Sequence, residues 1–316
     1  MKVLVTGSEG FIAKNLISKL LERNDLEVIA FNKSNSLKEL PFKIAGVDFV
    51  FHLAGVNRPL DKRDFKKGNE DFTKSLVEVL LSLDKKPRML YTSSVQAVLD
   101  NDYGRSKLEA ENVLIEARNC GLNVEIVRLA NVFGKWCKPN YNSAIATFCH
   151  NVASEKPVDI HDGSTQLSLT YIDDVIDKFI GILDQRDVVS GFSIDVPVYH
   201  KTITEVVDLL YSFVNIRNSL IVQEVGAGFE RALYSTFITY LPVAKFSYPL
   251  LMHTDDRGDF VEMLKTNSSG QFSYFTAYPG VCRGGHYHHS KTEKFLVLSG
   301  KAKFRFRHIL TEEYLE

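Results

Sequence analysis

A phenol and an ammonium group lie four residues apart in the stretch Tyr103-Gly-Arg-Ser-Lys107. Residues i and i+4 share one face of a helix, so the two groups become neighbours if this stretch opens a helix. A pKa near ~10 makes a tyrosine a poor acid–base group at neutral pH, and a nearby cation lowers that pKa. Ser94, nine residues upstream of Tyr103, can hydrogen-bond a substrate carbonyl oxygen. We predict that Ser94, Tyr103 and Lys107 form a proton-transfer site.

A glycine-rich stretch, TGSEGFIA at residues 6–13, stands between an apolar run and an amphipathic one. Gly7 permits a tight turn, Gly10 lets the backbone approach a pyrophosphate, and Ala13 lets a helix pack closely on a strand. The N-terminus of that helix offers free N–H groups and a positive dipole end to phosphates. This context predicts a dinucleotide site, with cofactor contacts from Gly7, Ser8, Gly10, Phe11 and Ile12.

The end of the second predicted strand indicates which dinucleotide is preferred. NAD sites usually place an acidic residue there, on the ribose 2′-hydroxyl. This chain has Asn32, Lys33 and Ser34 instead, and no acidic residue in the segment to repel a phosphate. Lys33 and Ser34 can bind a 2′-phosphate, which favours NADPH. The alternative interpretation is that Lys33 is a solvated loop lysine.

A second group of chemically capable residues lies near the end of the sequence. His286 and His288 are two apart, so they point to the same face if they lie on a strand, and Glu293 can return from a facing strand. Two imidazoles and a carboxylate form a half-shell for Zn²⁺ or another first-row divalent ion. We predict metal ligation by His286, His288 and Glu293; the alternative is a histidine-rich surface turn.

These residues need elements to position them, and the apolar pattern predicts two kinds. Short apolar runs alternate with helical patterns in the first half of the chain, which predicts a Rossmann-type doubly wound parallel sheet. After about residue 246 the pattern changes to short alternating runs, which predicts an antiparallel β domain. We therefore predict domains at 1–245 and 246–316. The expected strands are 2–7, 26–32, 49–55, 88–94 and 124–134, then 271–278, 293–300 and 301–308.

Composition limits the possible partners. The net charge is −1, so there is no electrostatic basis for binding nucleic acid or an anionic membrane. No apolar run reaches the ~18–20 residues of a transmembrane helix. The N-terminus runs directly into the first strand pattern, and the four cysteines show no paired spacing. We expect a cytoplasmic protein with reduced thiols.

Together these motifs resemble the extended branch of the short-chain dehydrogenase/reductase superfamily. The matching stretches are TGxxGF (6–11), HLAG (52–55), SS (93–94), YGxSK (103–107) and RxxNVxG (128–134). The resemblance implies that Tyr103 is the proton donor and that Lys107 also holds the nicotinamide ribose. It further implies that the cofactor is contacted by Leu53, Ala54 and Gly55, and that Asn131 touches the phosphates of a nucleotide sugar.

One position departs from that superfamily pattern. Sugar-nucleotide members usually carry an arginine shortly before a YVDD-like segment, whereas this chain has Leu167 in QLSLTYIDD. Diphosphate binding then falls to other cations, and Arg58, Lys135 and Lys138 are the candidates. The alternative is that each is a surface charge.

The C-terminal segment carries resemblances of its own. The spacing from Gly280 to Gly300 resembles the first cupin motif, and DDRGDFVE at 255–262 resembles the signature of 4-keto-sugar epimerases, which are also cupins. The second resemblance implies that Arg257 binds sugar-nucleotide phosphate; the alternative is an acidic turn before an edge strand. No second cupin motif follows Gly300, so we expect an all-β cupin domain, and a zinc site, that are incomplete.

The order of reductase and cupin resembles the CapF family of bifunctional capsular polysaccharide synthesis enzymes. FGKWCKPNYNSAIATFC at 133–149 is typical of it, supported by 52–59, 233–242 and 293–300. The resemblance implies a zinc-containing homodimer acting on a UDP-linked 4-keto-6-deoxy amino sugar. The cupin domain would epimerise C3, and the reductase domain would reduce C4 with NADPH to a UDP-2-acetamido-2,6-dideoxy-L-talose, on the route to UDP-N-acetyl-L-fucosamine.

Two other classes of protein share parts of this pattern. A UDP-sugar 4-epimerase or 4,6-dehydratase has the same scaffold, but dehydratases usually place Asp-Glu after the active-site Ser/Thr, where this chain has Val95-Gln96. A non-catalytic redox-sensing regulator binds NADP without the tyrosine–lysine pair. Because Tyr103 and Lys107 are both present, the sequence favours the reductase.

Overall fold

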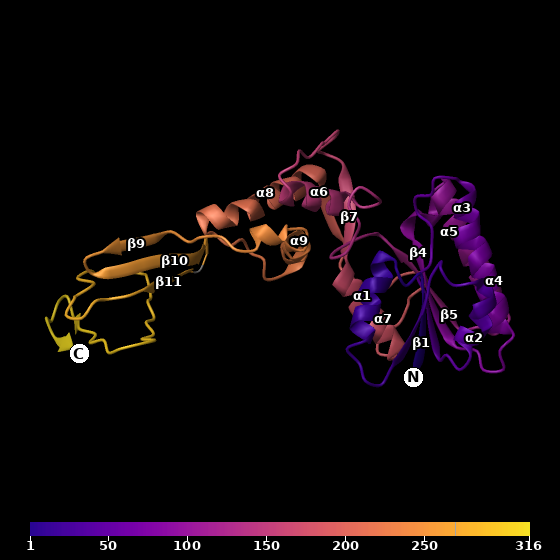
Figure 1. Ribbon diagram of the computed structural model, residues 1–316, viewed down its shortest axis with the longest axis horizontal. Helices are drawn as coiled ribbons and strands as arrows, with labels where there is room; N and C mark the ends of the chain where they lie inside the picture. Colours follow the sequence, from indigo (N-terminus) through magenta and orange to yellow (C-terminus); the bar gives the residue numbers. More distant parts are fainter. Residues whose placement is uncertain (269) are drawn as a thin grey trace. The chain divides into compact units, whose positions relative to one another are not determined.

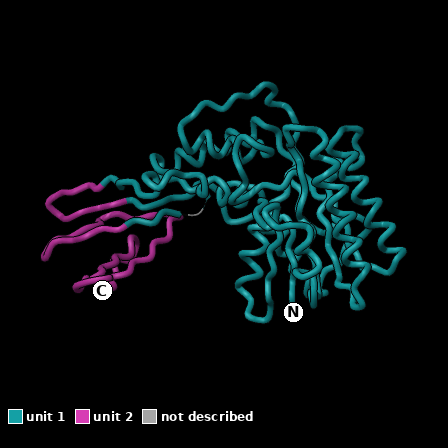
Figure 2. Tube along the Cα trace, turned by 45° about the vertical axis from the view of Figure 1, so that its right-hand side comes forward, with its two compact units in different colours: residues 1–251, 262–273 teal, residues 252–261, 274–316 magenta. Residues whose placement is uncertain are grey.

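The computed structural model describes residues 1–268 and 270–316 (Figure 1). The chain divides into two compact units (Figure 2). One unit contains residues 1–251 and 262–273, and the other contains residues 252–261 and 274–316. The boundary between residues 245 and 246 stays a prediction.

A five-stranded parallel sheet forms the centre of the first unit, in the order β2-β1-β3-β4-β5. Its strands are β1 (Lys2–Thr6), β2 (Glu27–Phe31), β3 (Phe49–His52), β4 (Arg88–Ser94) and β5 (Val124–Leu129). Successive strand residues alternate between two cores: Val3 and Val5 pack on one face of the sheet and Leu4 on the other. Burial on both faces explains why these runs are almost continuously apolar.

Helices cover both faces of this sheet, which confirms the doubly wound prediction (Figure 1). One face carries α1 (Phe11–Leu20) and α7 (Ile172–Leu183). The other face carries α2 (Leu40–Ile44), α4 (Phe72–Leu81) and α5 (Asp102–Asn119). Short helical turns lie between them, at α3 (Arg63–Phe65), Leu37–Glu39, Lys66–Asp71 and Val95–Val98.

The predicted strand over 124–134 is wrong in one respect, because it is two strands in different sheets. β5 ends at Leu129, and β6 (Asn131–Phe133) pairs in parallel with β7 (Gln166–Tyr171). An apolar run records burial but not the identity of the pairing strand, so the change of partner leaves no local signal. The second sheet has the order β6-β7-β8, with β8 at Tyr199–Thr202.

Three helices pack with the second sheet: α6 (Ala144–Ala153), α8 (Ile203–Ser219) and α9 (Gly228–Ile238). The longest of these, α8, begins directly after Thr202. Thr202 starts it with a capping box, in which its hydroxyl accepts from the Glu205 N–H while the Glu205 carboxylate accepts from the Thr202 N–H. A last helical turn covers Val243–Lys245. No helix among the described residues has both the length and the apolarity to cross a membrane.

The C-terminal segment forms antiparallel sheets, as the alternating pattern predicted. The first has the order β11-β10-β9, from β9 (Met252–Asp255), β10 (Gly258–Thr266) and β11 (Gly270–Phe275). The second pairs β12 (Phe306–Arg307) with β13 (Tyr314–Leu315).

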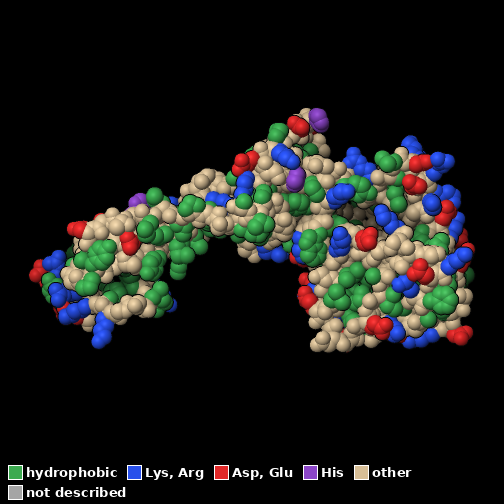
Figure 3. Space-filling model, in the orientation of Figure 1, with side chains coloured by type: hydrophobic (Ala, Val, Ile, Leu, Met, Phe, Trp, Pro, Cys, Tyr) green, Lys and Arg blue, Asp and Glu red, His purple; other side chains and the backbone are tan. Residues whose placement is uncertain are grey.

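The strands predicted over 293–300 and most of 301–308 are wrong, because the structure assigns no strand to the described residues 281–305. Every residue from 284 to 316 is exposed, and hydrophobic side chains lie on the surface of this part of the chain (Figure 3). A strand is stable only where its backbone donors and acceptors find partners. Alternating apolar and polar residues indicate a propensity for extended backbone, but they do not show that a neighbouring strand is available to pair with it.

Candidate active site

The turn between β1 and α1 has the geometry that its glycines predict. Gly7 has a φ of +68°, and a Cβ there would stand 2.6 Å from the Ala54 Cα, so a larger residue would push the loop after β3 away. The Gly10 N–H closes the turn by donating to the Gly7 carbonyl at 2.8 Å. Among the described residues no side chain caps α1, which leaves its first N–H groups available for an anion.

Tyr103 and Ser94 come together where β4 ends and α5 begins. Ser94 is the last residue of β4, and its side chain hydrogen-bonds Tyr103. The Asn101 side chain caps α5 by accepting from the Gly104 N–H at 2.8 Å. Gly104 lets the helix approach the preceding turn, since a Cβ there would lie 2.3 Å from the Gln96 carbonyl oxygen. The proton-transfer pair therefore depends on a close backbone contact.

Lys107 lies one helical turn beyond Tyr103 but does not contact its hydroxyl. Its ammonium donates to the Tyr91 hydroxyl at 3.1 Å and to the Thr92 carbonyl at 2.8 Å. Only 5% of Lys107 is exposed, and this desolvation lowers its pKa to about 8. The prediction that Lys107 lowers the pKa of Tyr103 is not met in this structure: burial raises that pKa, and the Ser94 hydrogen bond offsets only part of the rise. The pKa of Tyr103 is therefore set by desolvation, because the Lys107 ammonium is directed to Tyr91 and Thr92.

A buried chain of hydrogen bonds, which sequence reasoning missed, joins the cofactor turn to this site. His52 is fully buried, with Nδ1 2.7 Å from the Thr6 hydroxyl and Nε2 2.9 Å from the Thr73 hydroxyl. The Thr73 hydroxyl donates to the Asn69 carbonyl at 2.6 Å, so it must accept from Nε2–H, and Nδ1 then accepts from Thr6. Burial, and secondarily the Lys107 charge, lower the pKa of His52 to about 3, which keeps the ring neutral.

Asn69 continues this chain toward the catalytic helix. Its side chain donates to the Ser106 hydroxyl at 2.8 Å and accepts from the Val56 N–H at 2.7 Å. A Cβ on Gly55 would lie 3.2 Å from the Asn69 Oδ1 and 3.3 Å from the Lys107 Nζ, so a larger residue there would crowd both groups. The signal available in the sequence was a histidine ending the otherwise apolar strand Phe49–His52.

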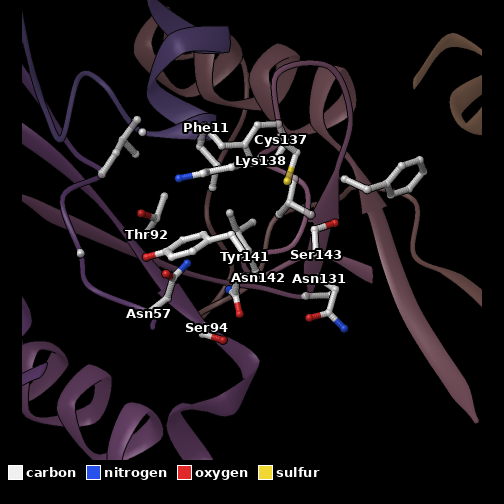
Figure 4. A pocket seen from close by; sticks show the side chains of 18 of the residues that line it. Phe11, Asn57, Thr92, Ser94, Asn131, Cys137, Lys138, Tyr141, Asn142 and Ser143 are labelled. Carbon is white, nitrogen blue, oxygen red and sulfur yellow. The ribbon is translucent and has the colours of Figure 1, made fainter. Parts of the chain in front are cut away.

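A cavity of about 620 Å³ opens at this end of the parallel sheet (Figure 4). Its volume is in the range of small-molecule sites, and such sheets bind ligands at the carboxyl ends of their strands. The predicted residues that line it are Gly10, Phe11, Ile12, Leu53, Gly55, Ser94, Tyr103, Lys107, Asn131 and Lys138. Lining residues without a predicted role include Asn57, Trp136 and Tyr141.

The predicted substrate cations are separated by the structure. Lys138 lines the cavity, with its Nζ 5.8 Å from the centre of the Tyr141 ring. Arg58 and Lys135 are not among the lining residues: Arg58 donates to the Tyr141 carbonyl, and Lys135 pairs with Asp173. Arg58 and Lys135 therefore fasten the segment that carries Lys138 instead of facing the cavity.

The region around Asn32 also differs from the expectation. Lys33 and Ser34 are exposed, and the Ser34 hydroxyl donates to the Asn32 Oδ1 at 2.6 Å. An acidic group is nevertheless present, because the Asn32 amide donates to the Glu9 carboxylate at 3.2 Å. The β1–β2 pairing brings the first glycine-rich turn beside the end of β2, a contact that the local sequence of residues 32–34 does not reveal.

In the second unit, the ligand atoms of His286, His288 and Glu293 all lie within 4.8 Å of one another. The predicted strand is absent, yet the side chains alternate: the His286 and His288 rings are 5.0 Å apart. All three residues are exposed, and the Glu293 carboxylate is 2.7 Å from the Lys291 ammonium. Two imidazoles and a carboxylate fit a zinc ion, which would displace that lysine contact.

Arg257, the remaining predicted substrate residue, lies in the turn between β9 and β10. Its guanidinium donates to the Asp255 carboxylate at 3.0 and 2.5 Å. An anion at this arginine would have to compete with that carboxylate.

Two known protein families match successive parts of this chain. The NAD dependent epimerase/dehydratase family model matches residues 3–195, and the polysaccharide biosynthesis C-terminal domain matches residues 253–316. A UDP-2-acetamido-2,6-beta-L-arabino-hexul-4-ose reductase from Pseudomonas aeruginosa is 52% identical over 318 residues, covering 100% of this chain and 85% of that protein.

A solved structure agrees in both sequence and fold. The crystal structure of the capsular polysaccharide assembling protein CapF from Staphylococcus aureus matches with a TM-score of 0.92 and 41% identity, covering 100% of this chain and 86% of that one. The chain belongs to the CapF family. A UDP-glucuronic acid 4-epimerase from Bacillus cereus, 18% identical with a TM-score of 0.65 over 76% of this chain and 98% of that one, shares the fold alone. The predicted family and fold class are confirmed.

Proposed function

We propose that this CapF-family protein reduces the C4 ketone of a UDP-linked 2-acetamido-2,6-dideoxy-4-hexulose with NADPH. The observation that carries the proposal is one cavity that contains Ser94, Tyr103 and Lys107 beside the uncapped N-terminus of α1. The Pseudomonas relative, whose name states reduction of a UDP-linked hexulose, supports the substrate class.

The residues of the cavity then have distinct roles in the reduction. NADPH, when bound at the β1–α1 turn, supplies the hydride that adds to C4. As the carbonyl π bond breaks, the Tyr103 phenol donates its proton to O4 and the Ser94 hydroxyl hydrogen-bonds that oxygen. The Lys107 ammonium, which in this structure donates to Tyr91 and Thr92, would have to turn toward Tyr103 to stabilise the phenolate until solvent returns a proton. Burial of Tyr103 favours ketone reduction, because it raises the pKa of the phenol and so keeps it protonated before hydride transfer.

Substrate and cofactor contacts extend the proposal around the same cavity. Asn131 and Lys138 would bind the UDP diphosphate, with Lys138 replacing the arginine absent at Leu167. Arg58 and Lys135 would hold the loop of Lys138. Lys33 and Ser34 would bind the 2′-phosphate of NADPH, while the Asn32 amide holds the nearby Glu9 carboxylate by a hydrogen bond.

The C-terminal segment supports a second activity on the same sugar. We propose a cupin domain in which His286, His288 and Glu293 hold zinc and Arg257 binds sugar-nucleotide phosphate. This domain would epimerise C3, where the adjacent ketone acidifies the C–H bond, so that C4 reduction yields the L-talo product. Hydrophobic side chains exposed between residues 252 and 316 favour a homodimer. We place the enzyme in the cytoplasm.

One experiment tests both steps. The protein is incubated with the UDP-4-keto sugar and NADPH in D₂O, while absorbance follows NADPH and NMR follows deuterium at C3. We expect NADPH consumption with deuterium at C3, and loss of consumption in Tyr103→Phe. Consumption without deuterium would refute the epimerase step. No net NADPH oxidation would refute the reductase and favour a 4-epimerase, which keeps its cofactor bound.

A further inference from the structure

A buried carboxylate follows the catalytic pair on the same face of α5. Tyr103, Lys107 and Glu111 are spaced at four-residue intervals, and Glu111 is 0% exposed. The Arg128 guanidinium on β5 donates to both of its oxygens, at 2.9 and 2.5 Å. The Ser93 hydroxyl on β4 donates to the same carboxylate at 2.5 Å. Glu111 thus links the catalytic helix to the two strands beneath it.

Arg128 is itself held in place. Its guanidinium carbon lies 4.2 Å from the centre of the Phe192 ring, and its backbone N–H donates to the Phe192 carbonyl at 2.8 Å. This packing fixes the arginine over the sheet while leaving 21% of its side chain exposed. The carboxylate therefore meets a preorganised, bidentate partner.

Stability alone does not account for a carboxylate at this position. Desolvating two charges costs about as much as their attraction returns, so a buried ion pair is often no more stable than an apolar pair of similar volume. Apolar side chains such as leucine and methionine could pack α5 against the sheet equally well. The negative charge of Glu111 therefore needs a reason other than stability.

The surroundings of Lys107 provide one. The ammonium donates to the Tyr91 hydroxyl on β4, and the neutral His52 on β3 senses its charge. On its own helix, Tyr103 and Glu111 lie one turn before and one turn after it. Among the described residues, Glu111 is the acid whose charge acts on Lys107, and it opposes the effect of desolvation on the pKa of that lysine. Without it, Lys107, which is 5% exposed, would have no nearby anion among the described residues to keep it charged.

We propose that Glu111 is a positioning residue of the reductase: held by Arg128, it keeps Lys107 in its ammonium form and fixes Ser93 beside the catalytic Ser94. The inference rests on the proposed reductase function. The charge acts on Lys107, one helical turn before Glu111, and the Ser93 hydrogen bond acts on the strand end that supplies the hydroxyl for O4. Neither effect requires Glu111 to touch substrate or cofactor.

Glu111→Gln tests the proposal, because it keeps the size and one acceptor oxygen but removes the charge. We expect the alkaline limb of kcat against pH to move down by about one unit, the size of shift that one nearby charge brings. Glu125→Gln is the matched control: Glu125 lies on β5 at the opposite end of the sheet, 3.6 Å from Arg88. The control should leave the profile unchanged, and KM for the sugar should change less than threefold in both variants.

A conservative variant separates charge from shape. Glu111→Asp keeps the charge and shortens the reach to Ser93, so its alkaline limb should stay near that of the wild type even where kcat falls. Equal shifts in Glu111→Asp and Glu111→Gln would make the role structural and overturn the proposal. So would a Glu111→Gln profile that superimposes on the wild type.

A measurement without substrate keeps this test independent of the proposed reaction. In protein labelled with ¹³C-lysine, the Lys107 Cε resonance, identified by its loss in Lys107→Met, reports the protonation of that side chain. Its titration midpoint should fall by about one pH unit in Glu111→Gln. An unchanged midpoint overturns the inference, whereas a wild type that consumes no NADPH overturns only the proposed function. Glu111→Gln protein that does not fold is replaced by Glu111→Met/Arg128→Leu, which leaves no unpaired buried charge and should lower the midpoint equally. An unchanged midpoint in that variant likewise overturns the inference.

Discussion

Gly104→Ala should inactivate this enzyme although alanine is the better helix former. Gly104 lies in the first turn of α5, directly after Tyr103. An added Cβ would stand 2.3 Å from the Gln96 carbonyl oxygen and 2.5 Å from the Leu99 carbonyl oxygen. Both obstacles are backbone atoms of the preceding turn, so no side chain can rotate away to make room.

The magnitude follows from two opposing effects. In an open helix, glycine to alanine gains about 1 kcal/mol, whereas inserting a methyl group into a packed contact typically costs about 1–3 kcal/mol. Relief of the contact needs a shift of about 1 Å, and a misplacement of that size can lower a catalytic rate about 100-fold. Because Tyr103 precedes the altered residue, the shift falls on the proton donor. We expect kcat to fall about 100-fold and the melting temperature by a few degrees.

The assay is NADPH oxidation with the UDP-4-keto sugar, together with thermal unfolding followed by circular dichroism. Gly226→Ala is the matched control, since among the described residues no atom lies within 4 Å of a Cβ there. The control should keep its activity and melting temperature. Gly104→Ala with kcat within threefold of the wild type would refute the steric reasoning.

Two further predictions concern groups outside the proton-transfer site. His52 has a folded pKa of about 3 against 6.5 for the free side chain. The unfolded chain binds more protons between these values, so the free energy of unfolding should fall as pH drops from 6.5, by up to about 1.4 kcal/mol per unit. Urea denaturation of His52→Gln should lack that part of the slope; an identical slope would contradict it. Lys138→Ala should raise KM for the UDP-sugar about tenfold with little change in kcat, as expected for one charged hydrogen bond. The exposed Lys156→Ala is its control, and equal KM values in the two variants would remove Lys138 from the diphosphate.

The C-terminal segment shows why an alternating sequence pattern does not suffice to predict a strand. The alternating run at 293–300 has the composition of a strand, but its residues are exposed and belong to no strand. His286 and His288 still share a face, because two-residue alternation is a property of extended backbone itself. The spacing of the two histidines thus follows from local geometry. The predicted strand at 293–300 needed a pairing strand, which the local sequence does not identify.

Features set by neighbours along the chain could be read from the sequence alone. The Gly7–Gly10 turn, the placing of Tyr103 and Lys107 on one helix, and the capping of α8 by Thr202 each depend on residues within four positions. Turn dihedrals and i,i+4 spacing decide such features before any tertiary contact forms.

Tertiary structure alone decided which distant groups meet. It placed Glu9 beside Asn32, directed Lys107 to Tyr91, left Lys138 in the cavity, and buried Glu111 against Arg128. Strand order and helix packing set these distances, and the protonation of buried groups depends on charges within a few ångströms and on lost solvent. The sequence therefore determined the chemistry available to this protein, and the fold determined which groups carry charge and where they act.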